Sequence, residues 1–125
     1  MLSRVGVGFM RLLACLPLAW VRAIGRVLGW LLFGLAVSRR RVVQVNLALC
    51  FPDLPKSVRR SMAMQTFVHF AQAWLDRGWL WHGSASMLRQ RLRLRGALQE
   101  LQGNQATVLF APHFVGLDAG WTALT

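Results

Sequence analysis

The first 38 residues constrain this chain most, because they are almost entirely apolar and yet carry arginines at intervals. The longest stretch without a charge runs from Val27 to Ser38, which is twelve residues. A helix needs about 20 apolar residues to cross a bilayer. The segment is therefore not typical of a simple transmembrane span, and no acidic residue occurs before Asp53 to neutralise its arginines.

A helical projection separates these arginines from the apolar side chains. At 100° per residue, four arginines fall within roughly 60° of one another: Arg4, Arg11, Arg22 and Arg26. Six large apolar residues project on the opposite side: Phe9, Leu13, Leu16, Trp20, Val27 and Leu31. This pattern is typical of a helix lying in the membrane interface, kinked or split at Pro17. A tilted anchor with snorkelling arginines, a helix packed on the rest of the protein and a signal peptide are the alternatives.

The charge balance narrows the choice of partner. The chain has 15 Lys and Arg residues against 4 Asp and Glu, a net charge of +11, and 55% hydrophobic residues. So apolar a composition excludes a disordered polycation, and no helix-turn-helix, zinc or RNA-recognition motif supports nucleic acid as a partner. The cluster Arg39, Arg40 and Arg41 follows the apolar segment, which predicts a cytoplasmic position and contacts with lipid phosphates.

Two further helices are predicted in the middle of the chain. The first runs from Arg39 to Leu49 and ends before the turn at 51–55, where Pro52 and Pro55 prevent a helix from continuing. The second begins near Lys56 or Ser57 and extends to about Trp81, because its apolar residues recur at helical spacing.

Beyond this helix the pattern changes to that of strands. Residues 91–95 alternate between arginine and leucine, so Arg91, Arg93 and Arg95 share one face of a predicted strand, either toward phosphate or toward solvent at a sheet edge. A short helix is predicted at 97–102, and the apolar run at 106–111 predicts a strand buried on both faces. We therefore expect an α/β fold that begins after an N-terminal membrane-associated helix.

Candidate catalytic residues follow this second strand. His113 comes at its carboxyl end, where α/β proteins bind ligands, and Asp118 comes five residues later. The two can meet only if His113 lies in a loop and Asp118 in the first turn of the next helix, and Gly116 permits the required turn. The carboxylate would then fix the imidazole tautomer and leave the other ring nitrogen as a base. Alternatively, Asp118 stabilises a helix N-terminus and His113 is a polar loop residue.

The chain resembles the bacterial lipid A biosynthesis acyltransferases, within the wider glycerolipid acyltransferase superfamily. The resemblance follows the sequence in order, from the apolar N-terminus through 41–47, Phe51-Pro52-Asp53-Leu54, the aromatic helix and Leu94-Arg95-Gly96 to His113 and Asp118. It implies that His113 is a general base and that Asp118 orients it, although many lipid A enzymes carry Glu at that position. The implied reaction moves an acyl chain from acyl carrier protein, or from acyl-CoA, to a hydroxyl group of a lipid A precursor, without a cofactor or metal.

The resemblance also implies a place in the cell and an incomplete chain. We expect residues 1–38 to form a membrane anchor or interfacial helix, and residues 39–125 to form the first part of a truncated catalytic domain at the cytoplasmic face of the bacterial inner membrane. Such a chain would be inactive alone. Two alternatives stay open, which are an acyltransferase for another lipid (a glycolipid mannoside, an ornithine lipid or a lysophospholipid) and a basic membrane-binding module without catalysis.

Overall fold

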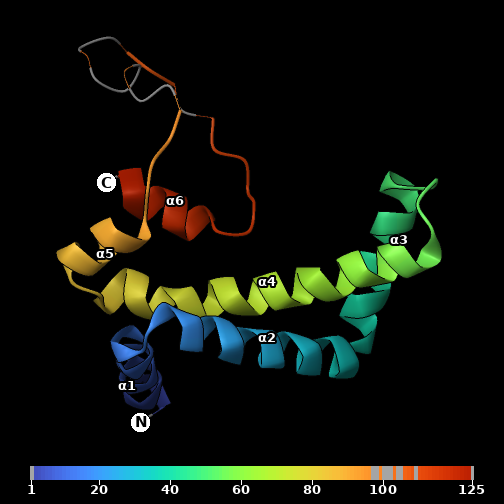
Figure 1. The fold of residues 1–125 in the computed structure, drawn as a ribbon, viewed down its shortest axis with the longest axis horizontal. Helices are drawn as coiled ribbons and strands as arrows, with labels where there is room; N and C mark the ends of the chain where they lie inside the picture. Colours follow the sequence, from blue (N-terminus) through green and yellow to red (C-terminus); the bar gives the residue numbers. More distant parts are fainter. Residues whose placement is uncertain (1, 97–98, 100–102, 104–105, 109, 125) are drawn as a thin grey trace. The chain divides into compact units, whose positions relative to one another are not determined.

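The computed structural model describes residues 2–96, 99, 103, 106–108 and 110–124. These residues form six helices (Figure 1): α1 (Leu2–Cys15), α2 (Leu18–Leu35), α3 (Val37–Cys50), α4 (Lys56–His82), α5 (Ala85–Arg91) and α6 (Leu117–Leu124). Contacts divide the chain into two compact units, Leu16–Leu75 and Met1–Cys15 with Asp76–Thr125, and the boundary between them falls within α4.

The prediction of an α/β fold is wrong, because the described residues contain helices and no strand. Arg91 ends helix α5, and residues 92–95 form neither a helix nor a strand. The described part of 106–111 is also irregular, with Val108 95% and Phe110 88% exposed. A strand needs a neighbouring strand to satisfy its backbone, and a short apolar run alone does not reveal whether such a neighbour exists. The short helix predicted at 97–102 lies, except for residue 99, outside the described residues.

The helices predicted at 39–49 and from Lys56 to about Trp81 are confirmed, and so are the breaks at Pro17 and 51–55, whereas the break at Ala36 was not predicted. Pro17 separates α1 from α2 and caps α2 with its carbonyl oxygen, which accepts from the backbone N–H of Trp20 at 3.0 Å. Helix α3 ends at Cys50, before the turn that contains Pro52, and α4 begins at Lys56. Proline lacks the backbone N–H and fixes φ, so these breaks can be read from the sequence.

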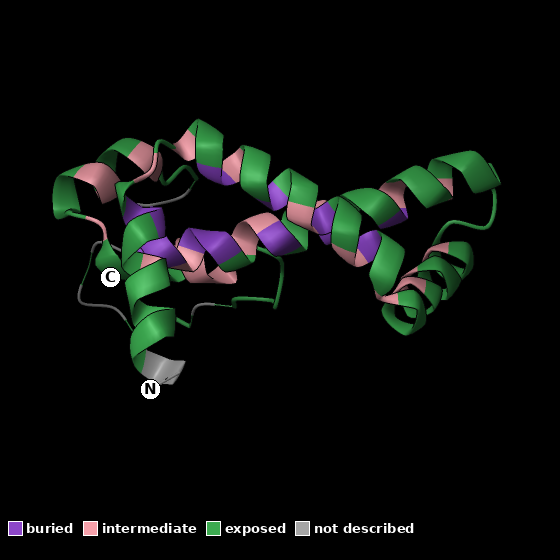
Figure 2. Cartoon of the chain, turned by 90° about the horizontal axis from the view of Figure 1, so that it is seen from below, coloured by how far each residue is buried: buried purple, intermediate pink, exposed green. Residues whose placement is uncertain are grey.

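In the unit Leu16–Leu75, α2 runs antiparallel to α4 with its buried residues spaced about one turn apart: Val21, Gly25, Gly29 and Phe33 (Figure 2). The glycines permit a close approach, since a Cβ on Gly25 would lie 2.6 Å from the Gln72 Cγ and one on Gly29 would collide with the backbone of Val68. The Gln72 side chain also donates to the Arg22 carbonyl oxygen at 3.0 Å. Gly25 and Gly29, one turn apart on α2, therefore allow its backbone to pack closely against α4.

Helix α3 completes the core at the end of this pair. Phe33 and Phe67 meet edge to face, with ring centroids 5.6 Å apart, and they enclose Ala63. Val43 and Leu47 of α3 pack against this cluster. Burial of these apolar side chains stabilises the packing of the three helices.

In the second unit, α1 packs against the last turns of α4. A Cβ on Gly78 would lie 2.8 Å from the Leu13 Cβ and 2.9 Å from the Met10 carbonyl oxygen. Leu13 and Trp79 are each 2% exposed, so the aromatic end of α4 belongs to this core. The four arginines projected onto one stripe are thus divided between two helices, with Arg4 and Arg11 on α1 and the others on α2.

Candidate active site

His113 lies in a tight turn between Phe110 and helix α6. The backbone N–H of Phe114 donates to the Pro112 carbonyl oxygen at 2.9 Å, and Gly116 has a φ of 93°. Only glycine adopts such a φ without strain, so Gly116 permits the turn as its sequence position predicts. The His113 side chain is exposed to solvent.

Asp118 lies in the first turn of α6, as predicted, but its carboxylate is bound to an arginine. The Arg77 Nε donates to the Asp118 Oδ2 at 2.7 Å, across two helices of the same unit. The two side chains are 39% and 45% exposed. An ion pair this open to water contributes about 0–1 kcal/mol to stability, so its main effect is to fix the direction of the carboxylate.

The structure does not bring the imidazole and the carboxylate into contact. Among the residues that it describes, His113 makes no side-chain hydrogen bond, and the second carboxylate oxygen, Asp118 Oδ1, accepts none. A carboxylate has two acceptor oxygens. Arg77 therefore leaves one oxygen of Asp118 available to a ring N–H.

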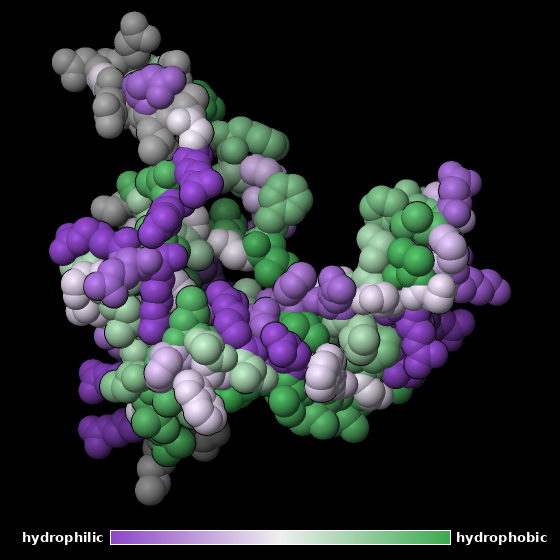
Figure 3. Space-filling model, viewed as in Figure 1, coloured by the Kyte–Doolittle hydropathy of each residue, from purple (hydrophilic) through white to green (hydrophobic). Residues whose placement is uncertain are grey.

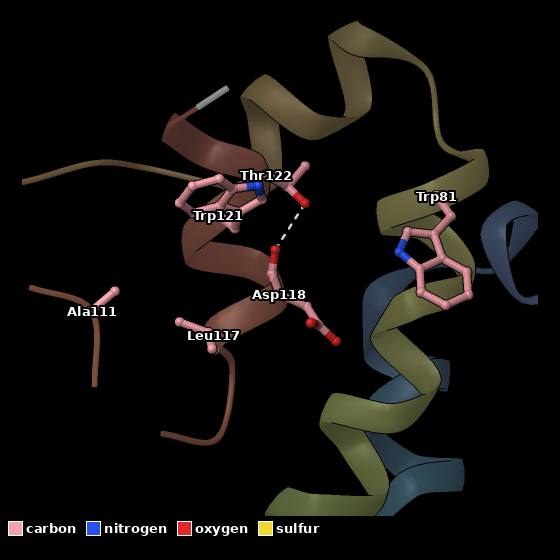
Figure 4. A pocket seen from close by; sticks show the side chains of 6 residues that line it. All are labelled: Trp81, Ala111, Leu117, Asp118, Trp121 and Thr122. Carbon is pink, nitrogen blue, oxygen red and sulfur yellow. Dashed lines mark hydrogen bonds between the residues drawn. The ribbon is translucent and has the colours of Figure 1, made fainter. Parts of the chain in front are cut away.

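A cavity of about 350 Å³ lies beside Asp118, lined by Trp81 of α4, by Ala111 and by Leu117, Asp118, Trp121 and Thr122. Figure 4 shows the Asp118 carboxylate turned toward the side of α4, and the Thr122 hydroxyl donating to the Asp118 carbonyl oxygen at 2.8 Å. His113 is not part of this lining. Apolar walls with a single carboxylate suit an organic ligand better than a metal ion, and no group of three metal-binding side chains is found in the described part of the chain.

Sequence reasoning missed the polar groups at the end of α4. Asp76 is 7% exposed, and its Oδ1 accepts from the Trp79 indole N–H at 2.8 Å. The neighbouring Arg77 places its guanidinium 5.9 Å from the Trp81 ring centroid and holds Asp118. The available signal was that Asp76 is one of only four acidic residues in the chain and occurs among large apolar side chains, where a carboxylate needs a partner.

The arginines predicted to contact phosphate have different environments. Arg39 and Arg41 are exposed, whereas Arg40 is half-buried and donates to the Phe33 carbonyl oxygen at 2.8 Å. Arg93 and Arg95 are exposed on an irregular segment. Arg91 is half-buried at the end of α5, with its guanidinium 5.2 Å from the Trp79 ring centroid, so the row of three arginines on a strand face does not form.

Comparison with known sequences identifies the family of this chain. Residues 1–125 match the family described as bacterial lipid A biosynthesis acyltransferase. The chain belongs to this family, and the resemblance inferred from its motifs is confirmed.

Two curated relatives agree with this assignment. The chain is 34% identical over 120 residues to a lipid A biosynthesis acyltransferase of Haemophilus influenzae, a match that covers 93% of the chain and 38% of the relative. It is 25% identical over 122 residues to the lipid A biosynthesis lauroyltransferase of Escherichia coli, with 95% and 40% covered. The chain thus spans about two fifths of the length of these relatives. No solved structure gives a significant match.

Proposed function

We propose that the protein containing this chain transfers a fatty acyl group from a thioester to a hydroxyl group of a lipid A precursor. The observation that carries the proposal is the placement of His113 and Asp118 on either side of the left-handed turn at Gly116, in a chain of this family. The His113 imidazole is exposed and accessible to an incoming substrate. The Asp118 carboxylate has one oxygen available to accept the N–H of the imidazole.

In the proposed reaction, His113 acts as a general base. Its unprotonated ring nitrogen removes the proton from a hydroxyl group of the acceptor, and the resulting alkoxide oxygen attacks the carbonyl carbon of the acyl thioester. The new ester bond forms as the carbon–sulfur bond breaks. The thiolate of acyl carrier protein, or of coenzyme A, leaves and takes up the proton from the imidazolium. The reaction requires no metal, cofactor or acyl-enzyme.

Asp118 orients the base in this mechanism. Its Oδ1 accepts the N–H of the imidazole, which fixes the tautomer and stabilises the imidazolium while the proton is held. Arg77 positions the carboxylate by holding Oδ2 at 2.7 Å. The Arg77 and Trp81 side chains thereby link the end of α4 to the proposed catalytic turn.

The proposed place of action is the cytoplasmic face of the bacterial inner membrane. Helix α2 is long and apolar enough to cross a bilayer by length and composition. The net charge of +11 favours both an anionic lipid acceptor and the acidic surface of acyl carrier protein. Residues 1–38 supply the membrane contact in this proposal, and residues 39–125 supply part of the catalytic machinery.

Substitution of the proposed base in the full-length protein tests this function. With acyl-acyl carrier protein and a lipid A precursor as substrates, we expect His113→Ala to lower kcat by about 10²-fold to 10⁴-fold, the usual contribution of a general base. His82→Ala is the matched control, because His82 is also exposed and lies in the same unit. Unchanged turnover in His113→Ala, or an equal loss in the control, contradicts the assignment of the base.

A further inference from the structure

The face of α2 that points away from α4 is apolar along its whole length. Its exposed large side chains fall in an arc between roughly 120° and 260° of a helical projection: Trp20, Ile24, Val27, Trp30, Leu31 and Leu35. No charged residue of α2 projects into this arc. Figure 3 shows hydrophobic surface gathered over α2 on the side away from α4. An exposed apolar patch of this extent marks an interaction site.

The opposite face of α2 is fixed to α4 at three levels. Arg22 contacts Gln72, Gly29 contacts Val68, and Phe33 contacts Phe67, so the two helices stay together over most of the length of α2. Wherever α2 lies in the membrane, α4 must lie beside it and be compatible with the same surroundings.

Helix α4 is too polar to accompany α2 across a bilayer. Beside α2 it exposes Gln65 and His69, and these side chains would lose their water in the hydrocarbon core. Length and composition permit α2 to span, but its packing does not.

We infer that α2 lies in the plane of the membrane surface, with its apolar face among the acyl chains of anionic phospholipids and α4 on the aqueous side. Arg26 is exposed at the border of the apolar face, and Arg39 and Arg41 are exposed just beyond the end of α2. These are the positions at which an interfacial helix places cations near lipid phosphates. The inference rests on contacts within Leu16–Leu75 and is independent of the proposed acyl transfer.

Charge favours a lipid surface over a second copy of the chain as the occupant of this face. Two copies would each bring a net charge of +11, with no acidic residue before Asp53 to pair with the arginines around the face. An anionic bilayer offers both an apolar interior and phosphate groups. The acyl chains of such a bilayer therefore match the apolar face of α2, and its phosphate groups match the arginines at the edge of that face.

Native cysteines provide a test that distinguishes a surface helix from a span. Cys15 and Cys50 are free and exposed, and they lie on either side of α2 in the sequence. The full-length variants Cys50→Ser and Cys15→Ser each keep one of them. We expect a membrane-impermeant maleimide to label Cys15 and Cys50, each followed by mass spectrometry of its own peptide, from the same side of sealed membrane vesicles. If one thiol reacts only after detergent is added, α2 crosses the membrane and the inference is wrong.

Vesicle binding tests the face itself. For the purified full-length protein, we expect Val27→Glu to weaken binding to phosphatidylglycerol-containing vesicles about tenfold, because a large apolar side chain leaves the acyl chains. Gln65→Glu makes the same change in charge at an exposed position of α4 in the same unit, and serves as the control. Equal losses in both variants would mean that charge alone binds the vesicle, and unchanged binding accompanied by dimer formation would assign the face to a second copy. Either result overturns the inference.

Discussion

The pair formed by α2 and α4 differs from the segment that carries His113 in how completely its apolar groups are covered. Phe33 is 9% exposed and packs against Phe67, whereas Phe110 is 88% and Phe114 is 72% exposed. Helices satisfy their own backbone hydrogen bonds and need only one covered face. An extended segment needs a neighbour both for its backbone and for its side chains. Local sequence is thus sufficient to form the helical pair, whereas it is insufficient to form the predicted strand in the described part of 106–111.

Truncation of an aromatic ring in each region should give the largest difference in the free energy of unfolding. We expect Phe33→Ala to lower the free energy of unfolding by about 3–5 kcal/mol, because it leaves a cavity beside Phe67. Phe110→Ala, the matched control, should change it by less than about 0.5 kcal/mol because its ring is already in solvent. Denaturant unfolding followed by circular dichroism measures both, and similar losses would show that the segment around Phe110 is packed.

The helical part of the fold was predictable because its signals are local. Pro17, Pro52 and Pro55 mark the breaks between helices, and the apolar residues of α4 recur at helical spacing from Val58 to Leu75. The absence of a strand in the described part of 106–111 could not be predicted. Apolar residues such as Val108 and Phe110 are found in buried strands, and their composition does not reveal whether a neighbouring strand is present. The close approach of α2 and α4 could not be predicted either. A glycine such as Gly29 can occur in a helix because the backbone must be flexible or because another helix packs against it, and the sequence does not distinguish the two.

The candidate site was predictable in position and not in its contacts. The spacing of His113, Gly116 and Asp118 indicates a turn that leads into a helix, and the structure has that turn. The partner of Asp118 comes from Arg77, which lies 41 residues earlier in the sequence. No local pattern relates residues so far apart, so the sequence alone could not distinguish an imidazole from a guanidinium as the partner.

Adding one methyl group at two glycines of α2 tests whether close approach holds the pair together. We expect Gly29→Ala to lower the free energy of unfolding by about 1–3 kcal/mol, because the new Cβ would collide with the Val68 backbone. Gly34→Ala lies on the same helix with nothing within 4 Å of the new atom, and should raise it by up to about 1 kcal/mol through helix propensity. Opposite signs in thermal or urea unfolding support the contact, whereas two stabilised variants would contradict it.

Removal of single arginines tests a smaller difference, between a cation that stabilises the helical pair and one that faces solvent. The Arg40 guanidinium bonds the Phe33 carbonyl oxygen at 2.8 Å near the end of α2 and lies 5.4 Å from the Phe33 ring centroid. A helix C-terminus carries partial negative charge and unsatisfied carbonyls, so Arg40→Ala should lower the free energy of unfolding by about 1 kcal/mol. Arg41→Ala removes an exposed charge one residue later and should lower it by less than about 0.5 kcal/mol. Urea unfolding in low and high salt distinguishes the two effects, because a loss at Arg40 that vanishes in salt would reflect net charge rather than the hydrogen bond to Phe33.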